Sequence, residues 1–387
     1  MARAKLLLPM ADAPGEYAVL YDRTSGATQV FSGKGKRKSN VQFRKRYEIL
    51  AQLYVSREAA GEAGSATDAA AATGEDKDGA EKDAAVGEDG GKAVEAAEKD
   101  NSVPLLLLGY EKTTGSGVLY AVTTDGHFQG LQKFVGWHNG WSSITALTDG
   151  TIVLHDRRSS KTEAHVLRQM SNDEMSRSLH SGASAGAAAA SAPVRAYQLH
   201  AMWTIADESF DEILSMTSPG GASFILFLTR KGVDNQGRIE SSRLTVLTSE
   251  GMDPSGTPRA SRHKLPFSWE SAVTDGSGLI LFYDRASASC YSVRVSCELG
   301  QTMKVEHLSA LQNVGQSWFA MRFWNGCRAV VGDDGDDNKA RVVFYDRANG
   351  RADLYTIDRE SGVLACVGEV PPALMTKRWD FVTTVAF

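Results

Sequence analysis

The sequence predicts an all-β fold, a single six-bladed β-propeller spanning residues 1–387. Two different short phrases each occur six times, and the way the chain begins and ends indicates a closed ring. About four strands fit into each repeat of roughly 45 residues once insertions are set aside, which is the period of a propeller blade. We therefore expect one domain, although the length would suffice for two or three average ones.

The first phrase reads as a β-hairpin whose turn begins with an acidic residue. β-branched and aromatic residues lead into the turn, and a Gly four residues after the Asp supplies the positive φ of a short connection. The simplest interpretation of Tyr-Asp-Arg here is structural, with the Asp accepting backbone hydrogen bonds and the Arg facing solvent; a repeated ligand-contacting Arg is the alternative. The six copies occupy 19–31, 107–122, 152–167, 225–247, 280–295 and 342–357.

The second phrase is an aromatic residue followed by apolar positions three and usually six residues later. Its six copies occupy 47–53, 141–147, 210–216, 269–275, 318–324 and 379–385. The chain starts inside a repeat and ends on the missing phrase, "RWDFVTTVAF". We therefore expect residues 379–387 to pair in the same sheet as 17–22, which removes the open edges of a linear array.

Two low-complexity segments interrupt the repeats. Residues 56–102 are rich in Ala, Gly and acidic residues, and 57–100 alone carry thirteen Asp/Glu against five Lys/Arg. Residues 169–193 are rich in Ser, Ala and Gly. Neither segment has enough large apolar residues to offset the entropy of ordering, so both are expected to be disordered insertions between blade strands.

Composition limits the compartment and the partners. The net charge of −5 gives no global attraction to nucleic acid or acidic membranes, and no apolar run is long enough to span a membrane. Four cysteines without CxxC spacing favour reduced structural thiols and a cytoplasmic location. The basic stretch 34–46 could be a nuclear-import signal, an anion-binding loop or a partner for the acidic insertion, but it does not indicate specific nucleic-acid binding.

Three segments carry a family resemblance. The stretch 117–147, "GVLYAVTTDGHFQGLQKFVGWHNGWSSITAL", resembles the tachylectin-like β-propeller lectins, whose blades have a Leu-Tyr-x-Val strand, a Gly-rich GW-x-NGW connection and an aromatic-led inner strand. "RWDFVTTVAF" resembles the blade ending of the same family. Residues 330–347, "VVGDDGDDNKARVVFYDR", resemble the related calcium-loop propeller repeats. The resemblance implies carbohydrate binding at sites between blades.

A sugar site needs an aromatic face for the ring and polar groups for the hydroxyls. The best local match is Trp137, His138, Asn139 and Trp141, in which Asn139 can donate and accept. Trp141 starts the repeated aromatic phrase, so its alternative role is packing between blades. Trp137 lies outside the phrase and is the better candidate for stacking on a sugar.

Weaker candidates lie elsewhere in the chain. Trp203 and Trp324 are also outside the repeated position and could contact a ligand. An acidic turn offers oxygen ligands for a possible Ca²⁺ through Asp333, Asp334, Asp336 and Asn338, although it lacks the Gly and the closing Glu of an EF-hand. A solvated acidic turn is the alternative, and no other cofactor is expected.

Three function classes remain open at this stage. The resemblance favours a lectin-like protein whose partners are glycans or glycoproteins. A protein-binding propeller scaffold is the first alternative. A propeller enzyme is the second, and it would show ionisable groups converging on the ring axis. No GxSxG, HExxH or phosphate-binding Gly loop supports a specific enzyme class.

Overall fold

The computed structural model divides the chain into two units, Met1–Ser56 with Pro104–Phe387, and Arg57–Val103. The second unit lies outside the described residues, so the description below concerns the first. The described residues are 16–32, 37–43, 45–54, 105–123, 126–170, 197–206, 208–230, 232–233, 239–240, 242–248, 261–297, 303–309, 311–315, 318–323, 338–369 and 381–386.

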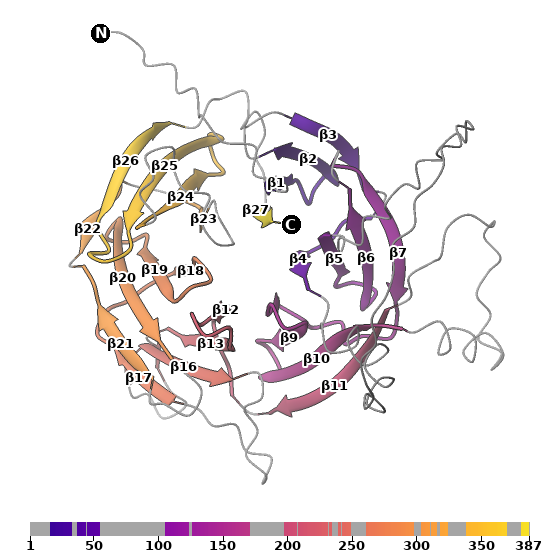
Figure 1. Ribbon diagram of the computed structural model, residues 1–387, viewed down its shortest axis with the longest axis horizontal. Helices are drawn as coiled ribbons and strands as arrows, with labels where there is room; N and C mark the ends of the chain where they lie inside the picture. Colours follow the sequence, from indigo (N-terminus) through magenta and orange to yellow (C-terminus); the bar gives the residue numbers. More distant parts are fainter. Residues whose placement is uncertain are drawn as a thin grey trace, which may run out of the picture. The chain divides into compact units, whose positions relative to one another are not determined.

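All regular structure in these residues is β-strand, and six sheets of four or five strands are arranged around a central axis, with a separate two-stranded hairpin (Figure 1). Each of the six larger sheets is one blade of a six-bladed β-propeller, as the sequence predicts. From the innermost strand outward, the first three blades are β27 (Phe381–Ala386), β1 (Glu16–Tyr21), β2 (Ala27–Ser32) and β3 (Arg37–Gln42); β4 (Ile49–Leu53), β5 (Leu105–Glu111), β6 (Ser116–Val122) and β7 (Phe128–Phe134); and β8 (Ser143–Ala146), β9 (Thr151–Asp156), β10 (Lys161–Gln169) and β11 (Tyr197–Ile205).

Blades 4 to 6 follow the same order, with two additions. The lengthened turn of blade 4 holds a small hairpin, and an extra strand pairs with the third strand of blade 5. Their strands are β12 (Glu212–Thr217), β13 (Ser223–Thr229), β16 (Ser242–Thr248) and β17 (Ser261–Leu265), with the hairpin β14 (Gly232–Val233) and β15 (Ile239–Glu240); β18 (Ser271–Thr274), β19 (Leu279–Asp284), β20 (Ser289–Ser296) and β21 (Lys304–His307), with β22 (Gln312–Asn313); and β23 (Ala320–Phe323), β24 (Lys339–Asp346), β25 (Arg351–Asp358) and β26 (Leu364–Glu369).

The ring is closed by the C-terminal strand. β27 pairs antiparallel with β1 in a register that runs from Glu16 opposite Ala386 to Tyr21 opposite Phe381. The inner strand of blade 1 therefore comes from the far end of the chain. The expected pairing of 379–387 with 17–22 is confirmed in register.

The antiparallel order of each blade defines two faces of the ring. Turns between the second and third strands lie on the same face as the connections between blades, and we call this the connection face. Turns between the first and second strands, and between the third and fourth, lie on the opposite face. A site is placed below by the face on which its loops lie.

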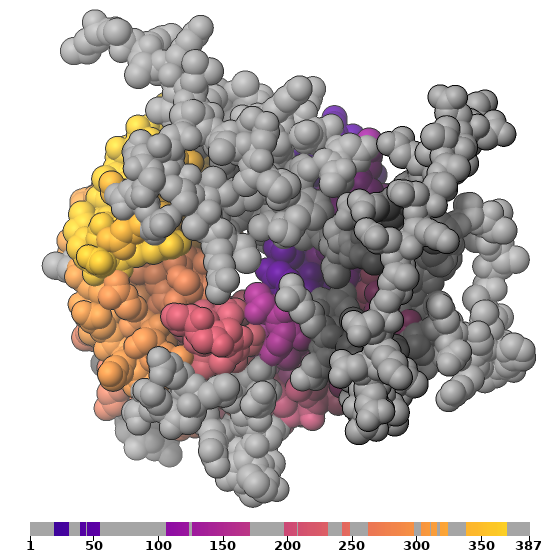
Figure 2. Space-filling model, in the orientation of Figure 1, coloured from indigo at the N-terminus to yellow at the C-terminus, as the bar shows by residue number. Residues whose placement is uncertain are grey.

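Neighbouring blades share their apolar cores. In the described residues, each of five buried clusters joins two adjacent blades, from blades 1 and 2 through to blades 5 and 6. Figure 2 shows blades 5 and 6, in orange and yellow, as one continuous surface. The leading aromatic residue is buried in all five aromatic phrases that the structure describes, as Tyr47, Trp141, Phe210, Trp269 and Trp318. The phrase repeats because every blade needs a large side chain at this position between blades.

The hairpin phrase supplies a polar contact to the next blade. The Tyr47 N–H donates to Tyr21 Oη across blades 1 and 2 at 2.7 Å. The equivalent residue of blade 3 is His155, whose Nε2 lies 3.0 Å from the carbonyl oxygen and 3.3 Å from the nitrogen of Phe210. In both pairs, the residue before the turn Asp contacts the backbone of the next blade's leading aromatic. The two repeated phrases are therefore joined by a direct interaction, which we call the inter-blade clasp.

The acidic residue of the turn has the predicted structural role. Oδ1 of Asp22, Asp284 and Asp346 each accepts a hydrogen bond from the backbone N–H two residues later, at 2.9 to 3.1 Å. The Arg that follows the turn Asp was expected only to face solvent, but in blade 3 it also makes an ion pair. Arg157 Nη2 lies 2.5 Å from Asp211 Oδ1 at the start of blade 4, so the side chain also bridges blades.

Several sequence expectations fall on residues that are not described. The predicted insertions 56–102 and 169–193 lie outside the described residues, except that Gln169 is the last residue of β10 and residue 170 follows it. The basic stretch 34–46 is described in part, and there it is not a loop. Its residues 37–42 form β3, the outermost strand of blade 1, and Phe43 is buried in the core.

Deleting residues 379–387 should destabilise the whole ring, because it leaves the β1 edge unpaired and opens the contact between the first and last blades. We expect a lower midpoint of urea unfolding in a single transition, measured by circular dichroism. The exposed-residue substitution Val367→Thr on the outer strand β26 is the control and should leave the midpoint nearly unchanged. A deletion variant with the parent midpoint would show that β27 does not close the ring.

Two glycines of blade 2 and its connection test the packing against the backbone. Gly115 and Gly136 both have positive φ, +58° and +77°, but a Cβ on Gly115 would lie 2.2 Å from the Trp137 carbonyl oxygen, whereas one on Gly136 would meet nothing within 4 Å. Gly136→Ala should cost about 1–2 kcal/mol for the left-handed conformation alone. Gly115→Ala should cost clearly more in the same urea titration, and equal losses would contradict the close approach.

Candidate functional site

The tryptophan predicted to stack on a sugar contacts the protein instead. The Trp137 ring is near-parallel to Phe134, with centroids 5.3 Å apart, and to Tyr110, with centroids 6.2 Å apart. The backbone of Gly117 lies close beneath it, because a Cβ there would be 3.1 Å from the indole. The half-buried Trp137 is thus part of the packing of blade 2.

His138 forms a structural contact with the turn of blade 3. Its Nε2 lies 2.7 Å from Asp156 Oδ2, and its ring meets Trp141 edge-on at 5.1 Å. A Cβ on Gly140 would lie 2.3 Å from His138 Nε2 and 2.5 Å from Asp156 Oδ2, so only glycine leaves room for this pair. Gly140 therefore leaves the space that the His138–Asp156 contact occupies.

The other predicted binding residues do not gather into one site. Asn139 is exposed on the connection before β8, whereas Trp141 is almost fully buried between blades 2 and 3. Trp203 is buried between blades 3 and 4. Trp324 lies outside the described residues.

The predicted calcium turn is described only at its last residue. Asp333, Asp334 and Asp336 lie outside the described residues, whereas Asn338 is described and its Nδ2 lies 3.3 Å from Asp358 Oδ2. In the part of the chain that the structure describes, no group of three or more His, Cys, Asp or Glu could hold a metal ion. The Ca²⁺ expectation stays a prediction about undescribed residues.

A charged cluster that the sequence analysis missed lies on the inner strands. Glu212 begins β12 in blade 4 and accepts a hydrogen bond from the backbone N–H of Ala272 on β18 in blade 5. The positive charge of Arg322, on β23 in blade 6, favours the ionised form of the Glu212 carboxyl. Both residues lie on innermost strands, β12 of blade 4 and β23 of blade 6, and blade 5 lies between these two blades (Figure 1).

Burial is the largest influence on Glu212 and raises the pKa of its carboxyl, while Arg322, then Arg230, then the Ala272 N–H oppose that rise. Glu212 keeps some contact with solvent, so it is accessible as well as desolvated. Arg230 is held in place because its Nη2 donates to the Glu270 carbonyl oxygen and its guanidinium lies 5.0 Å from the centroid of Trp269. Arg322 Nη1 donates to the carbonyl oxygen of Met321 at 2.8 Å. We call Glu212, Arg322 and Arg230 the axial cluster.

Aligning the six aromatic phrases would have revealed two members of this cluster. Two residues after the aromatic, only Glu212 is charged; the other phrases have Ile49, Ser143, Ser271, Ala320 and Phe381. Four residues after it, only Arg322 is charged; the others have Ala51, Thr145, Leu214, Val273 and Thr383. Departure from a repeat is the signal, because packing alone does not call for a charge at these positions.

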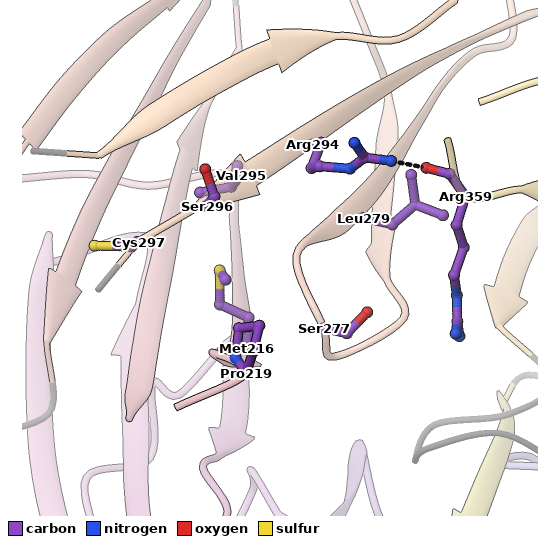
Figure 3. Close-up of a pocket in the computed structure, with 9 residues that line it drawn as sticks. All are labelled: Met216, Pro219, Ser277, Leu279, Arg294, Val295, Ser296, Cys297 and Arg359. Atoms are coloured by element: carbon purple, nitrogen blue, oxygen red, sulfur yellow. Dashed lines mark hydrogen bonds between the residues drawn. The ribbon is translucent and has the colours of Figure 1, made fainter. Parts of the chain in front are cut away.

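Two pockets lie between loops away from the axial cluster. One, on the connection face of blade 6, has a volume of about 340 Å³ and is lined by Trp318, Tyr355 and several polar residues. Its arginine is used internally, since Arg351 Nε and Nη2 donate to the two carboxylate oxygens of Asp353 at 3.1 and 2.9 Å. The other, on the opposite face, contains two arginines and an apolar wall (Figure 3).

Comparison with known proteins finds distant structural matches only. No family model and no curated protein matches the chain. A putative 6-phosphogluconolactonase from Bacteroides fragilis is 7% identical with a TM-score of 0.46, over 97% of this chain and 99% of that one. The periplasmic gluconolactonase PpgL of Pseudomonas aeruginosa is 10% identical with a TM-score of 0.44, over 96% and 99%. A chain of a nidogen–laminin complex is 9% identical with a TM-score of 0.44, over 96% and 98%.

The strand pairing of the structure itself defines a six-bladed β-propeller. Likeness at the level of these matches carries no conclusion about activity. The expected tachylectin-like lectin is corrected. The lactonase-named propellers among the matches do not support a lectin family. No finding tests the expected partners, glycans or proteins, so both remain predictions.

The structure does not test the compartment that the sequence predicts. The described part of the chain contains no apolar helix of membrane-spanning length. Cys290, Cys297 and Cys366 are free thiols. The cytoplasmic location and nuclear import remain predictions.

The Asp156 carboxylate offers a test of the structural role of its contacts. Burial would raise its pKa, but hydrogen bonds from Ser159, His138 and the Arg158 N–H outweigh it and lower the pKa from 3.8 to about 2. The folded state thus favours the charged form, and this contribution is present above pH 3.8 and is lost as the pH falls toward about 2. The shift corresponds to about 2 kcal/mol.

We expect Asp156→Asn to lower the free energy of unfolding at pH 7 and to flatten its decrease between pH 4 and 2, measured by urea titration at each pH. Asp149→Asn removes another turn-forming carboxylate of blade 3, which accepts from the Thr151 N–H at 2.8 Å, and serves as the matched control. An unchanged acid dependence in Asp156→Asn would show that the His138–Asp156 contact is not structural.

Proposed function

We propose that this propeller is an enzyme that acts on a small anionic molecule at the ring axis, with Glu212 as the general acid–base group. The observation that carries the proposal is a desolvated carboxyl on one inner strand that senses arginines from two other elements. Ionisable groups converging on the axis are the feature that separates an enzyme from the other function classes of this architecture.

The raised pKa of Glu212 suits proton transfer. A carboxyl with an ordinary pKa is fully ionised near neutral pH and is a weak general acid. Burial brings its pKa closer to the working pH, so both protonation states become available to a bound substrate. The partial exposure of the side chain leaves a substrate room to reach it.

The arginines supply the preference for an anion. Arg322 of blade 6 and Arg230 of blade 4 both act electrostatically on the Glu212 carboxyl, and each guanidinium donates to a backbone carbonyl oxygen. A guanidinium held in this way loses little freedom when it binds a carboxylate or phosphate. A substrate anion between them would lie beside the Glu212 carboxyl.

Sulfate is a suitable first probe, because it does not titrate in the range where Glu212 does. At constant ionic strength, sulfate should raise the melting temperature of the protein, and Arg322→Gln should reduce that rise. Protonation of Glu212 removes a negative charge beside the arginines, so binding should strengthen as the pH falls through the pKa of Glu212. Glu212→Gln should bind sulfate tightly without this pH dependence, whereas Glu369→Gln on the outer strand β26 should behave like the parent.

Turnover is tested with the anionic substrate 4-nitrophenyl phosphate, followed by nitrophenolate release. Loss of a general acid–base group should reduce kcat by at least about 100-fold in Glu212→Gln. Equal rates in the parent and in Glu212→Gln would contradict the catalytic role. A sulfate effect that survives Arg322→Gln unchanged would contradict the axial binding site.

A further inference from the structure

We propose that the pocket on the opposite face, between blades 4, 5 and 6, binds a small organic anion, a carboxylate carrying a short apolar chain. The pocket is formed by the turn after β12, the β18–β19 turn, the end of β20 and the residue after β25. It is separate from the axial cluster in its residues and does not depend on the function proposed there. Its lining combines cations and apolar side chains without a catalytic group.

The shape and lining select the size and polarity of the ligand. The volume is about 240 Å³, below the range of roughly 300–1,000 Å³ for drug-sized ligands, so the occupant is small. Figure 3 places Arg294 and Arg359 on one side, and Met216 and Pro219 on the other. A molecule with a charged end and an apolar end matches this division.

Arg294 is the group that would hold the anion. Its Nη2 donates to the Arg359 carbonyl oxygen, which fixes the guanidinium at the edge of the pocket (Figure 3). Its other contact is loose, because Nη1 lies 3.6 Å from Oε2 of Glu306, whose side chain is 64% exposed. Exposed pairs of this kind contribute little free energy, so a ligand carboxylate can replace Glu306 at low cost.

Asp275 and Arg359 form the rigid floor beside it. The Asp275 carboxylate is fully buried and accepts from the Ser277 N–H at 2.8 Å, Ser277 Oγ at 2.6 Å and the Leu279 N–H at 3.1 Å. Arg359 Nε lies 3.3 Å from Asp275 Oδ2, so its position is set from blade 5 although it belongs to blade 6. The charge of Asp275 is paired with that of Arg359. Within the described residues, Glu306 is the carboxylate that would compete with a ligand for Arg294.

Cys297 offers a reporter at the edge of the pocket. The residue lines the cavity with its thiol directed away from the two arginines (Figure 3), and burial raises the pKa of that thiol, so alkylation by iodoacetamide is slow and easily timed. Cys366 is exposed on β26 and serves as the internal control in the same sample. Mass spectrometry of the two peptides gives the ratio of their rates, which reports occupancy of the pocket alone.

The probes are acetate, hexanoate and sulfate, each at constant ionic strength and at up to the order of 10 mM, the range of weak small-ligand binding. Hexanoate should slow Cys297 and leave Cys366 unchanged, with the Cys297 rate halved when hexanoate reaches its dissociation constant. Acetate should protect less than hexanoate. Protection by sulfate but not by hexanoate would overturn the assignment to an organic anion, and protection by none of them would overturn the site.

Two variants at one ion pair give opposite expected results. Arg294→Gln should abolish the protection, whereas Glu306→Gln should give the same protection at a lower hexanoate concentration, because the competing carboxylate is gone. The increase cannot come from a folding defect, so it keeps the proposal testable if Arg294→Gln folds poorly. Protection that is unchanged in Glu306→Gln would overturn the role of Arg294, and Arg322→Gln should leave the protection intact.

Discussion

The ring depends on the inter-blade clasp, in which a polar side chain at the end of one blade's second strand contacts the backbone of the next blade's buried aromatic. Tyr21 contacts Tyr47 in this way and His155 contacts Phe210. His155 is buried, and burial lowers the pKa of its imidazole, so the neutral ring is favoured at this contact. Tyr21 and His155 directly precede the Asp that begins the turn between the second and third strands of their blade. One short phrase therefore contributes both to strand pairing within a blade and to the contact with the next blade.

A regular ring makes its exceptions informative. Side chains at equivalent positions meet equivalent surroundings, so a repeat of apolar or small residues records what packing requires. Glu212 and Arg322 each depart from such a repeat, and the charge of Arg322 opposes the rise in the pKa of Glu212 that burial causes. The arginines of the opposite-face pocket illustrate the same point, since Arg359 crosses from blade 6 to a buried carboxylate of blade 5.

The fold could be predicted from the sequence because its determinants are local and repeated. Each hairpin phrase contains its own turn, and the unmatched phrases at the two ends imply the pairing of β27 with β1. The site could not be predicted in the same way. The ring contacts of Trp137 with Phe134 and Tyr110 do not follow from its place outside the repeated phrase. Glu212 and Arg322 are more than 100 residues apart in the chain. Contacts between distant strands depend on side-chain direction across blades, which periodicity does not specify.

The composition of blade 1 has a consequence for synthesis of the protein. Its inner strand, β27, holds residues 381–386, whereas its other strands end at residue 42. On the ribosome these three strands therefore emerge early and lack their fourth partner until residues 381–386 have been translated. During that interval the nascent chain presents a sheet edge that a chaperone could occupy, and a prematurely terminated chain would keep that edge exposed and be recognised for degradation.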